Sequence, residues 1–290
     1  MHRPVCITYD STCDLTPQLL ERFRIRTIPL TIQSGERVFP DDGSYTSADL
    51  YDGYRKDGTL PKTSAISPEE FRGFFSAILD EGFDIVHIDI SSDLSCTCQN
   101  AVMAAQELAE RGQVHVVDSR QLSTGGGLLA LQGAKLRDSG MAAADIAAEL
   151  RRLAPHSDTS FVLDTLEYMW KGGRCSGVTA LGANMLKLKP SLEIRDGKLV
   201  VCKKYRGAME KVYRQYVTER LADKAVVEDW AFITHSGEVA EDTLRELTAL
   251  VQELAPFKEV FVTQAGCTVS SHCGPGTLGV LFLRRAEADA

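Results

Sequence analysis

Residues 89–99 read Asp-Ile-Ser-Ser-Asp-Leu-Ser-Cys-Thr-Cys-Gln, and they join an apolar run at 85–90 to an Ala-rich stretch. This pattern predicts a strand over 85–90, a turn rich in hydroxyl groups, and a helix from about Gln99 to Glu110. The first backbone N–H groups of a helix are unpaired, and the positive end of the helix dipole lies there. A carboxylate or phosphate can therefore be held without a cationic side chain, and Ser95 and Thr97 would add donors. The stretch predicts an oxyanion pocket.

The N-terminal part of the chain alternates short apolar runs with amphipathic stretches. Ser67-Pro68-Glu69-Glu70 is a capping box, which predicts a helix through Leu79. This alternation favours a parallel sheet with helices on both faces, a three-layer α/β/α arrangement. Such sheets bind ligands beyond the carboxyl ends of their strands. We expect one edge of the sheet to carry the polar groups that follow the predicted strands, at 10–12, 91–97 and 118–119.

The pattern changes after residue 155. Arg195-Asp196-Gly197-Lys198 is a hairpin turn between two β-like runs, 190–194 and 199–205, so antiparallel strands are expected there. The sequence predicts two α/β domains: residues 1–155 with a parallel sheet, and residues 156–290 with a mixed sheet.

Composition excludes several classes of function. The chain has 290 residues and a net charge of −8, which does not favour nucleic acid or an anionic membrane surface. The amino terminus turns polar at Asp10, and no apolar run approaches the roughly 18 residues of a membrane span, so we expect a cytoplasmic protein without stable membrane insertion.

The eight cysteines are expected to be buried free thiols, and Cys96-Thr97-Cys98 has no partner pair for a metal site.

A second pair of hydroxyl side chains, Thr63 and Ser64, lies in a polar loop over 59–67. Each hydroxyl cluster by itself is typical of a helix cap or a turn. Together, Thr63 and Ser95 suit a carboxylate clamp of neutral donors, in which no basic residue is expected beside the ligand, because phosphate more often recruits Lys or Arg.

Three further motifs remain open at this level. Gly172-Gly173-Arg174 is typical either of a helix end with a surface arginine or of a guanidinium that reaches an anion. His272 is expected in a loop, either structural or close to a ligand or partner that Gly274 and Gly276 would let approach. The glycines at 125–127 lack the Gly-Lys-Ser/Thr ending of a nucleotide loop, so ATP binding by this chain is not expected.

The motifs in this order resemble the DegV family of bacterial fatty-acid-binding proteins, which includes the lipid-carrying subunit of fatty acid kinase. The resemblance rests on five segments spread over nearly the whole chain: 10–15 (Asp-Ser-Thr-Cys-Asp-Leu), 63–67 (Thr-Ser-Ala-Ile-Ser), 91–97 (Ser-Ser-Asp-Leu-Ser-Cys-Thr), 166–174 and 272–276 (His-Cys-Gly-Pro-Gly). It implies a DegV-like fold of two domains, with the clamp on the first and the second covering an acyl chain.

The resemblance also implies the role of each site residue. Thr63 and Ser95 would hydrogen-bond the carboxylate of one long-chain fatty acid such as palmitate, with Ser64 and Thr97 beside them. The acyl chain would lie in an apolar tunnel between the domains. By the same resemblance, the chain is a carrier without cofactor or metal, and a separate ATP-dependent kinase subunit makes the acyl phosphate. Arg174 and His272 would face that partner or the transferred phosphate.

The chain departs from the family pattern in three places. Cys96 replaces the glycine of the usual Ser-Gly-Thr, which is expected either to narrow the head-group pocket or to place a thiol beside the ligand. Ala65 and Ile66 replace a Gln-Pro pair, which removes an amide donor and a rigid proline. Cys98 replaces a frequent aromatic residue, which is expected to alter the width of the tunnel.

Two alternatives belong to other functional classes. One is a serine hydrolase or acyltransferase with Ser95 as nucleophile and His272 as base, although no Gly-x-Ser-x-Gly elbow surrounds Ser95. The other is a regulatory binder of another small carboxylate, which differs from a lipid carrier in having a less apolar pocket.

Overall fold

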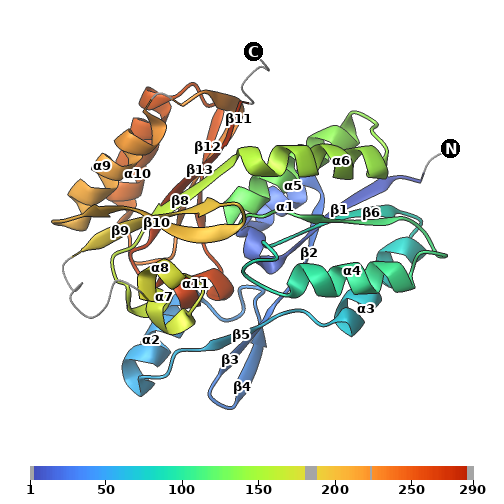
Figure 1. The fold of residues 1–290 in the computed structure, drawn as a ribbon, viewed down its shortest axis with the longest axis horizontal. Helices are drawn as coiled ribbons and strands as arrows, with labels where there is room; N and C mark the ends of the chain where they lie inside the picture. Colours follow the sequence, from blue (N-terminus) through green and yellow to red (C-terminus); the bar gives the residue numbers. More distant parts are fainter. Residues whose placement is uncertain (1–2, 180–187, 223, 286–290) are drawn as a thin grey trace.

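The structure, a computed structural model, describes residues 3–179, 188–222 and 224–285. Two large sheets with helices between and outside them form the body, and a small three-stranded sheet lies beside them (Figure 1). Within the described ranges, no helix is both long enough and apolar enough to cross a membrane.

The first sheet is parallel throughout, as predicted. Its strand order is β2-β1-β6-β7, with the bounds β1 Val5–Asp10, β2 Ile25–Ile28, β6 Asp84–Asp89 and β7 Val114–Asp118. Its two central strands, β1 and β6, are buried over almost their whole length because helices cover both faces. One face carries α3 (Pro68–Asp80) and α4 (Thr97–Glu107), and the other carries α5 (Thr124–Asp138) and α6 (Ala143–Leu153); α1 (Pro17–Phe23) packs beside β2.

Helix α3 begins where its capping box predicts. The Glu70 N–H donates to Ser67 Oγ (3.2 Å), and the Ser67 N–H donates to Glu70 Oε2 (2.7 Å). Phe71, Phe75 and Ile78, which recur at helical spacing, bury their side chains against the sheet. Helix α4 differs from the prediction by starting at Thr97 and ending at Glu107, because Cys96 is its N-cap.

The small sheet corrects one prediction. It begins with β3 (Thr31–Ser34), which follows β2 closely in the chain but belongs to a different sheet. The loop expected over 59–67 contains β5 (Lys62–Ser64), which pairs antiparallel with β3. On the other side β3 pairs with β4 (Arg37–Pro40), and α2 (Ser47–Asp57) follows, capped by Thr46.

The third sheet is mixed, as predicted. Its order is β10-β9-β8-β13-β11-β12, and all neighbours are antiparallel except β11 and β12, which are parallel. The strands are β8 Ser157–Val162, β9 Lys189–Arg195, β10 Lys198–Tyr205, β11 Val226–His235, β12 Glu259–Gln264 and β13 Leu278–Arg284. The predicted hairpin turn joins β9 to β10, with positive φ at Asp196 and Gly197. Helices α9 (Met209–Leu221) and α10 (Glu241–Leu254) cover the outer face.

Helix α5 lies between the two large sheets, and residues 124–134 are all buried. A Cβ at Gly125 would meet the Thr159 side chain, and a Cβ at Gly126 would meet the Tyr9 ring. The glycines at 125–127 therefore let the helix approach both sheets closely. The predicted division of the chain at residue 155 stays a prediction, although β8 is the first strand of the mixed sheet.

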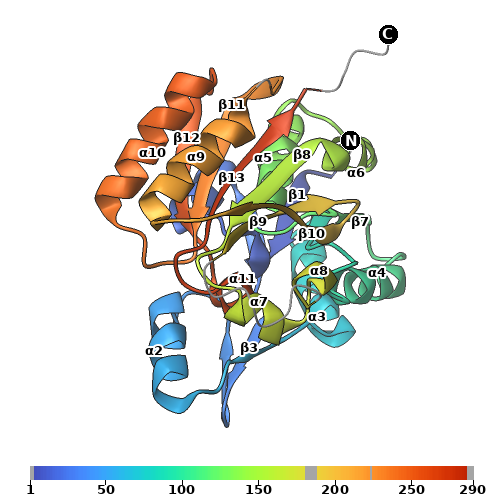
Figure 2. The ribbon, with the colours of Figure 1, turned by 60° about the vertical axis from the view of Figure 1, so that its left-hand side comes forward.

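Three short helices lie between the mixed sheet and the small sheet (Figure 2): α7 Glu167–Gly172, α8 Ser176–Thr179 and α11 Cys267–Cys273. Two 3-10 turns complete the described structure: Ser11–Cys13 and Ala154–His156.

Candidate functional site

A cavity of about 340 Å³ lies where elements from all three sheets meet. Its polar wall contains four hydroxyl side chains, Thr63, Ser64, Ser95 and Thr268, together with Arg174 and His272. The remaining wall is mainly apolar and is built from Leu30, Ile90, Leu94, Leu122, Phe161, Met169, Leu199 and Val269. One cavity thus combines a small set of donors with a long apolar surface.

Ser95 is positioned by the turn between β6 and α4. The N–H groups of Leu94 and Ser95 donate to Ser91 O (2.9 and 3.1 Å), which closes the turn. Ser95 Oγ accepts from the Thr97 N–H (3.2 Å) and shares a hydrogen bond with Thr97 Oγ1 (2.7 Å). Thr97 is fully buried and is absent from the cavity wall. It therefore orients the Ser95 hydroxyl from behind.

The turn that carries Ser95 also receives contacts from neighbouring strands. The Ile90 N–H donates to Asp10 Oδ2 (2.8 Å), and Ser92 Oγ donates to Asp118 Oδ2 (2.6 Å). The polar residues after β1, β6 and β7 thus meet at one edge, as predicted. Asp10 itself is buried away from the cavity, and burial, with Asp89 nearby, raises its pKa to about 7.

The mixed sheet contacts the same turn. Ser91 Oγ donates to Gly197 O at the tip of the β9–β10 hairpin (2.8 Å). Asp93 lies 3.7 Å from both Arg120 and Lys198, measured between charged atoms. The position of Ser95 therefore depends on both large sheets.

Thr63 and His272 meet on the other side of the cavity. Thr63, in the centre of β5, pairs in register with the fully buried Ile32. Thr63 Oγ1 and His272 Nε2 are hydrogen-bonded at 3.2 Å. Ser64, the next residue of β5, is exposed at the cavity.

The expectation of a loop around His272 is wrong, because His272 belongs to α11. Asp41 accepts hydrogen bonds from the N–H groups of Cys267 (2.8 Å) and Thr268 (3.0 Å) at the start of this helix. Asp14 accepts from the Gly266 N–H (2.8 Å). Two acidic residues from distant segments thus satisfy the free N–H groups of α11 and hold it in place.

The two glycines after His272 lie outside the wall of the main cavity. Gly274 has a φ of +76°, and a Cβ there would meet the Tyr168 ring; Gly276 has a φ of +67°, and a Cβ there would meet Asp164. Both positions therefore serve close packing within the chain.

The pKa of His272 is lowered to about 4, mainly by burial and further by the positive charge of Arg174. His272 is therefore neutral near pH 7. Its Nδ1 is buried and has no hydrogen-bond partner among the described residues, and it lies against Gly172, where a Cβ would collide with it.

Arg174 fits both interpretations of its motif. Gly173 caps α7 in the left-handed conformation, and Arg174 Nη1 donates to Gly172 O (2.7 Å). The exposed side chain also lines the cavity. The expected clamp without a nearby basic residue is thus wrong on this point, since a cation lies in the same wall.

The residues that depart from the family pattern lie at different depths. Cys96 is exposed and lines the cavity, and the partly buried Ala65 also lines it. Ile66 is buried, and its carbonyl accepts from Asn100 Nδ2 (2.7 Å), which ties the segment to α4. Cys98 is buried outside the cavity wall. All eight cysteines are free, as predicted, but Cys96 and Cys202 are exposed.

A smaller cavity of about 20 Å³ lies next to the first and shares Leu122, Phe161, Val269 and Cys273 with it. Its wall is continuous with the apolar part of the main cavity. Across the described ranges, no group of His, Cys, Asp and Glu side chains has an arrangement that would hold a metal ion.

Comparison with known proteins assigns this arrangement to a family. The family model described as "Uncharacterised protein, DegV family" matches residues 4–285. The chain belongs to the DegV family. A DegV domain-containing protein of Deinococcus radiodurans is 30% identical over 282 residues, which cover 95% of this chain and 97% of that protein.

Two solved DegV structures agree with the fold over nearly their whole length. A fatty-acid-binding DegV family protein from Thermus thermophilus matches with a TM-score of 0.85 and 30% identity, covering 97% of this chain and all of that one. A DegV lipid-binding protein from Thermotoga maritima matches with a TM-score of 0.84 and 25% identity, covering 99% and 100%. The DegV fold predicted from the sequence is confirmed.

Proposed function

We propose that the chain binds one long-chain fatty acid in the main cavity and presents its carboxylate to a separate ATP-dependent kinase subunit. The observation that carries this proposal is the composition of the cavity wall, with hydroxyl groups from three segments and apolar side chains from both large sheets. The two solved relatives, which bind a fatty acid and a lipid, support the same ligand class.

The carboxylate contacts Thr63 and Ser95. Ser95 lies beside the N-terminus of α4, an eleven-residue helix, where the dipole favours an anion. The Nε2–H tautomer of neutral His272 donates to Thr63 Oγ1, which leaves the Thr63 hydroxyl free to donate to the ligand. Ser64 is the next donor on the same strand, and Thr97 fixes the Ser95 hydroxyl.

The apolar wall supplies the binding energy. Removing a sixteen-carbon chain from water yields about 0.8 kcal/mol per methylene, or roughly 10 kcal/mol before the entropic costs of binding. Leu122 and Phe161 border both the main cavity and the smaller one, so the acyl chain passes these residues to reach further space.

The kinase subunit transfers the γ-phosphoryl group of ATP to a carboxylate oxygen, which gives an acyl phosphate and ADP. Arg174 is exposed at the cavity and neutralises the incoming phosphate. His272 remains neutral and positions Thr63. The chain itself carries no catalytic group in this account and needs no cofactor.

The geometry of the structure does not favour the hydrolase. A serine nucleophile needs a hydrogen bond to its base and a third group that orients the base. Ser95 Oγ bonds to Thr97, His272 bonds to Thr63, and His272 Nδ1 has no partner among the described residues.

The clamp is tested by titrating delipidated protein with palmitate. Each of Thr63→Ala and Ser95→Ala is expected to weaken binding by about 1–3 kcal/mol, or roughly 5- to 150-fold, because each removes one donor to a buried carboxylate. Ser139→Ala, at an exposed hydroxyl after α5, is the control and leaves binding unchanged. Palmitate affinity that is equal in all four proteins would contradict the clamp.

The kinase step is tested separately, by adding a purified fatty acid kinase subunit and ATP to the loaded protein and measuring acyl phosphate. Arg174→Gln is expected to lower acyl phosphate formation while palmitate binding is retained. A variant that keeps full phosphorylation, or loaded protein that yields no acyl phosphate with a competent subunit, would contradict the presentation of the carboxylate.

A further inference from the structure

A second cavity of about 340 Å³ lies beyond the tip of the β9–β10 hairpin, and charged side chains form most of its wall. Arg120 and Gln121 reach it from the segment after β7, and Asp196 and Gly197 reach it from the hairpin turn. Leu122, the next residue after Gln121, lines the main cavity instead. The two cavities are thus separate spaces on either side of a thin wall.

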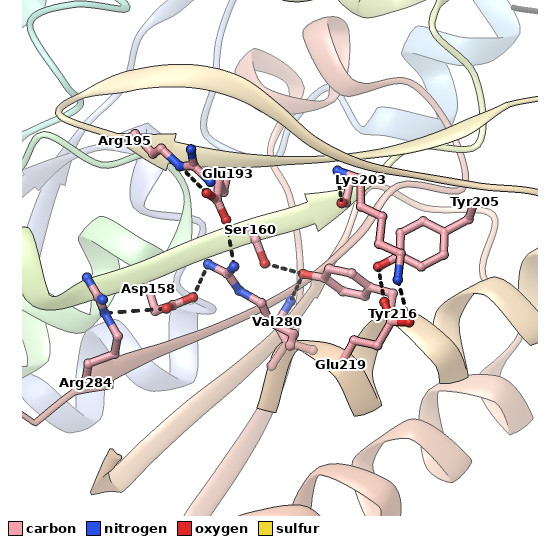
Figure 3. Close-up of polar contacts among 12 residues, drawn as sticks. Asp158, Ser160, Glu193, Arg195, Lys203, Tyr205, Tyr216, Glu219, Val280 and Arg284 are labelled. Atoms are coloured by element: carbon pink, nitrogen blue, oxygen red, sulfur yellow. Dashed lines mark hydrogen bonds and ion pairs between the residues drawn. The ribbon is translucent and has the colours of Figure 1, made fainter. Parts of the chain in front are cut away.

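A buried ion-pair cluster forms the base of this cavity. Asp158 on β8 and Glu193 on β9 lie on neighbouring strands (Figure 3). Arg220 from α9 pairs with Asp158 and, at 2.7 Å, with Glu193. Only 15% of the Arg220 side chain is exposed, with 4% and 10% for the two carboxylates. Because each charge has a partner, this base is a fixed surface rather than a set of mobile chains.

Cations remain in excess after this pairing. The wall contains five cationic side chains, Arg120, Arg195, Arg220, Lys224 and Arg284, against three carboxylates, Asp158, Glu193 and Asp196. Arg195 and Arg284 each also contact one carboxylate of the base, and they are 65% and 45% exposed (Figure 3). A local excess of positive charge in a chain of net charge −8 attracts an anion to this position.

One wall residue also has unused hydrogen-bonding capacity. Gln121 is 3% exposed, and its Nε2 donates to Ala154 O (3.0 Å), but its Oε1 has no hydrogen-bond partner within the described part of the chain. A buried acceptor without a donor costs about 1–3 kcal/mol. A ligand that brings a hydroxyl group together with its anionic group satisfies this oxygen.

We propose that the charged cavity is a binding site for a small phosphate-bearing anion, with the phosphate on the cationic wall and a ligand hydroxyl on Gln121. The forked guanidinium groups of arginine match the oxygens of a phosphate, and a dianion suits a wall with two surplus positive charges. The volume is at the lower end of that of small-molecule sites and exceeds what a bare phosphate fills, so a phosphorylated small molecule fits. This site is independent of the fatty-acid cavity and of the kinase step.

The test is isothermal titration of the full chain with inorganic phosphate, glycerol 3-phosphate and glucose 6-phosphate. At least one of them is expected to bind with a Kd below about 1 mM. The double variant Lys224→Gln/Arg284→Gln, which keeps the contacts of Arg220 with Asp158 and Glu193, is expected to weaken that binding about tenfold or more. Binding of the esters assigns the site to a phosphorylated metabolite, and binding of phosphate alone assigns it to the free anion.

Lys211→Gln/Arg285→Gln is the matched control, because it removes the same charges from an exposed position on α9 and from the residue next to Arg284, both outside the cavity wall. This control is expected to bind as the original chain does. No binding of any phosphate compound, or an equal loss in both double variants, would overturn the proposal.

Discussion

The two cavities on either side of the β9–β10 hairpin have the same volume, about 340 Å³, but walls of different chemistry, mainly apolar in one and mainly charged in the other. The main cavity has hydroxyl groups, His272 and one cation, Arg174, at its polar wall and mainly apolar side chains elsewhere. The base of the charged cavity consists of buried side chains that are already ion-paired with one another, Arg220 with Asp158 and Glu193. Removing one polar group therefore has different consequences. In the main cavity the loss weakens ligand binding. In the charged cavity it leaves a buried charge without its partner, which destabilises the fold.

The largest effect is expected for Arg220→Leu in the charged cavity. This change leaves Asp158 and Glu193 without their shared partner and is expected to lower the free energy of unfolding by about 3–5 kcal/mol, measured by urea denaturation. Arg214→Leu on the same helix is the control, since its contact with Glu246 (3.5 Å) is exposed, and its cost is expected to stay below about 1 kcal/mol. Equal losses of unfolding free energy in the two variants would contradict a stabilising role of the buried ion pairs at the base of the cavity.

A loss of palmitate binding without a loss of the fold is expected for Leu94→Glu in the main cavity. Leu94 is only partly buried, so the fold is retained, but an acyl chain would have to pack beside a carboxylate. Palmitate affinity is expected to fall by about 100-fold or more, or roughly 2.7 kcal/mol. Leu254→Glu, at a 38% exposed position on α10, should leave affinity unchanged. Full palmitate affinity in Leu94→Glu would place the acyl chain elsewhere.

A smaller effect is expected from the titration of His272. Its folded-state pKa of about 4 lies below the unfolded value of 6.5, so the unfolded chain binds the proton first as the pH falls. The stabilising contribution of neutral His272 is therefore complete above about pH 6.5 and is lost as the pH falls from there towards 4.

The measurement is the difference in unfolding free energy between the original chain and His272→Gln. This difference is expected to be about 2 kcal/mol smaller at about pH 5 than at about pH 7.5. Asp10, with a raised pKa of about 7, changes stability in the opposite sense, and comparing the two proteins cancels its effect. A difference that does not vary with pH would contradict the burial of a neutral imidazole.

The smallest effect is expected for Gly172→Ala. The added methyl group meets the His272 ring, which must move away from Thr63, so palmitate affinity is expected to fall about fivefold. Gly73→Ala is the control, because nothing lies within 4 Å of its added Cβ on the exposed side of α3, and it should leave affinity unchanged. Unchanged affinity in Gly172→Ala would show that the position of His272 does not matter for the ligand.

The sequence predicted those parts of the fold that depend on local signals. The capping box at Ser67 predicts the start of α3, and the turn at Asp196-Gly197 predicts the β9–β10 hairpin, because both are determined by a few adjacent residues. The alternation of apolar runs and helices likewise predicts the parallel sheet. The five-segment resemblance predicted the family.

Long-range contacts account for what the sequence did not reveal. β5 exists because it pairs with β3, and α11 is held at its start by Asp41, far away in the chain. Asp14 belongs to the segment 10–15, one of the five that carry the family resemblance. This was the sequence signal that could have indicated its contact with the start of α11. The charged cavity had no such signal, since Asp158, Arg220 and Arg284 come from distant positions that only the mixed sheet and α9 bring together.

The most direct test of the account is native mass spectrometry of the purified chain, followed by denaturing extraction of any small molecule. We expect one fatty acid per chain, depleted in the double variant Thr63→Ala/Ser95→Ala and retained in Arg174→Gln. A chain that carries no fatty acid and takes up none when palmitate is added, or one that retains it equally without both hydroxyl groups, would contradict the assignment of the main cavity.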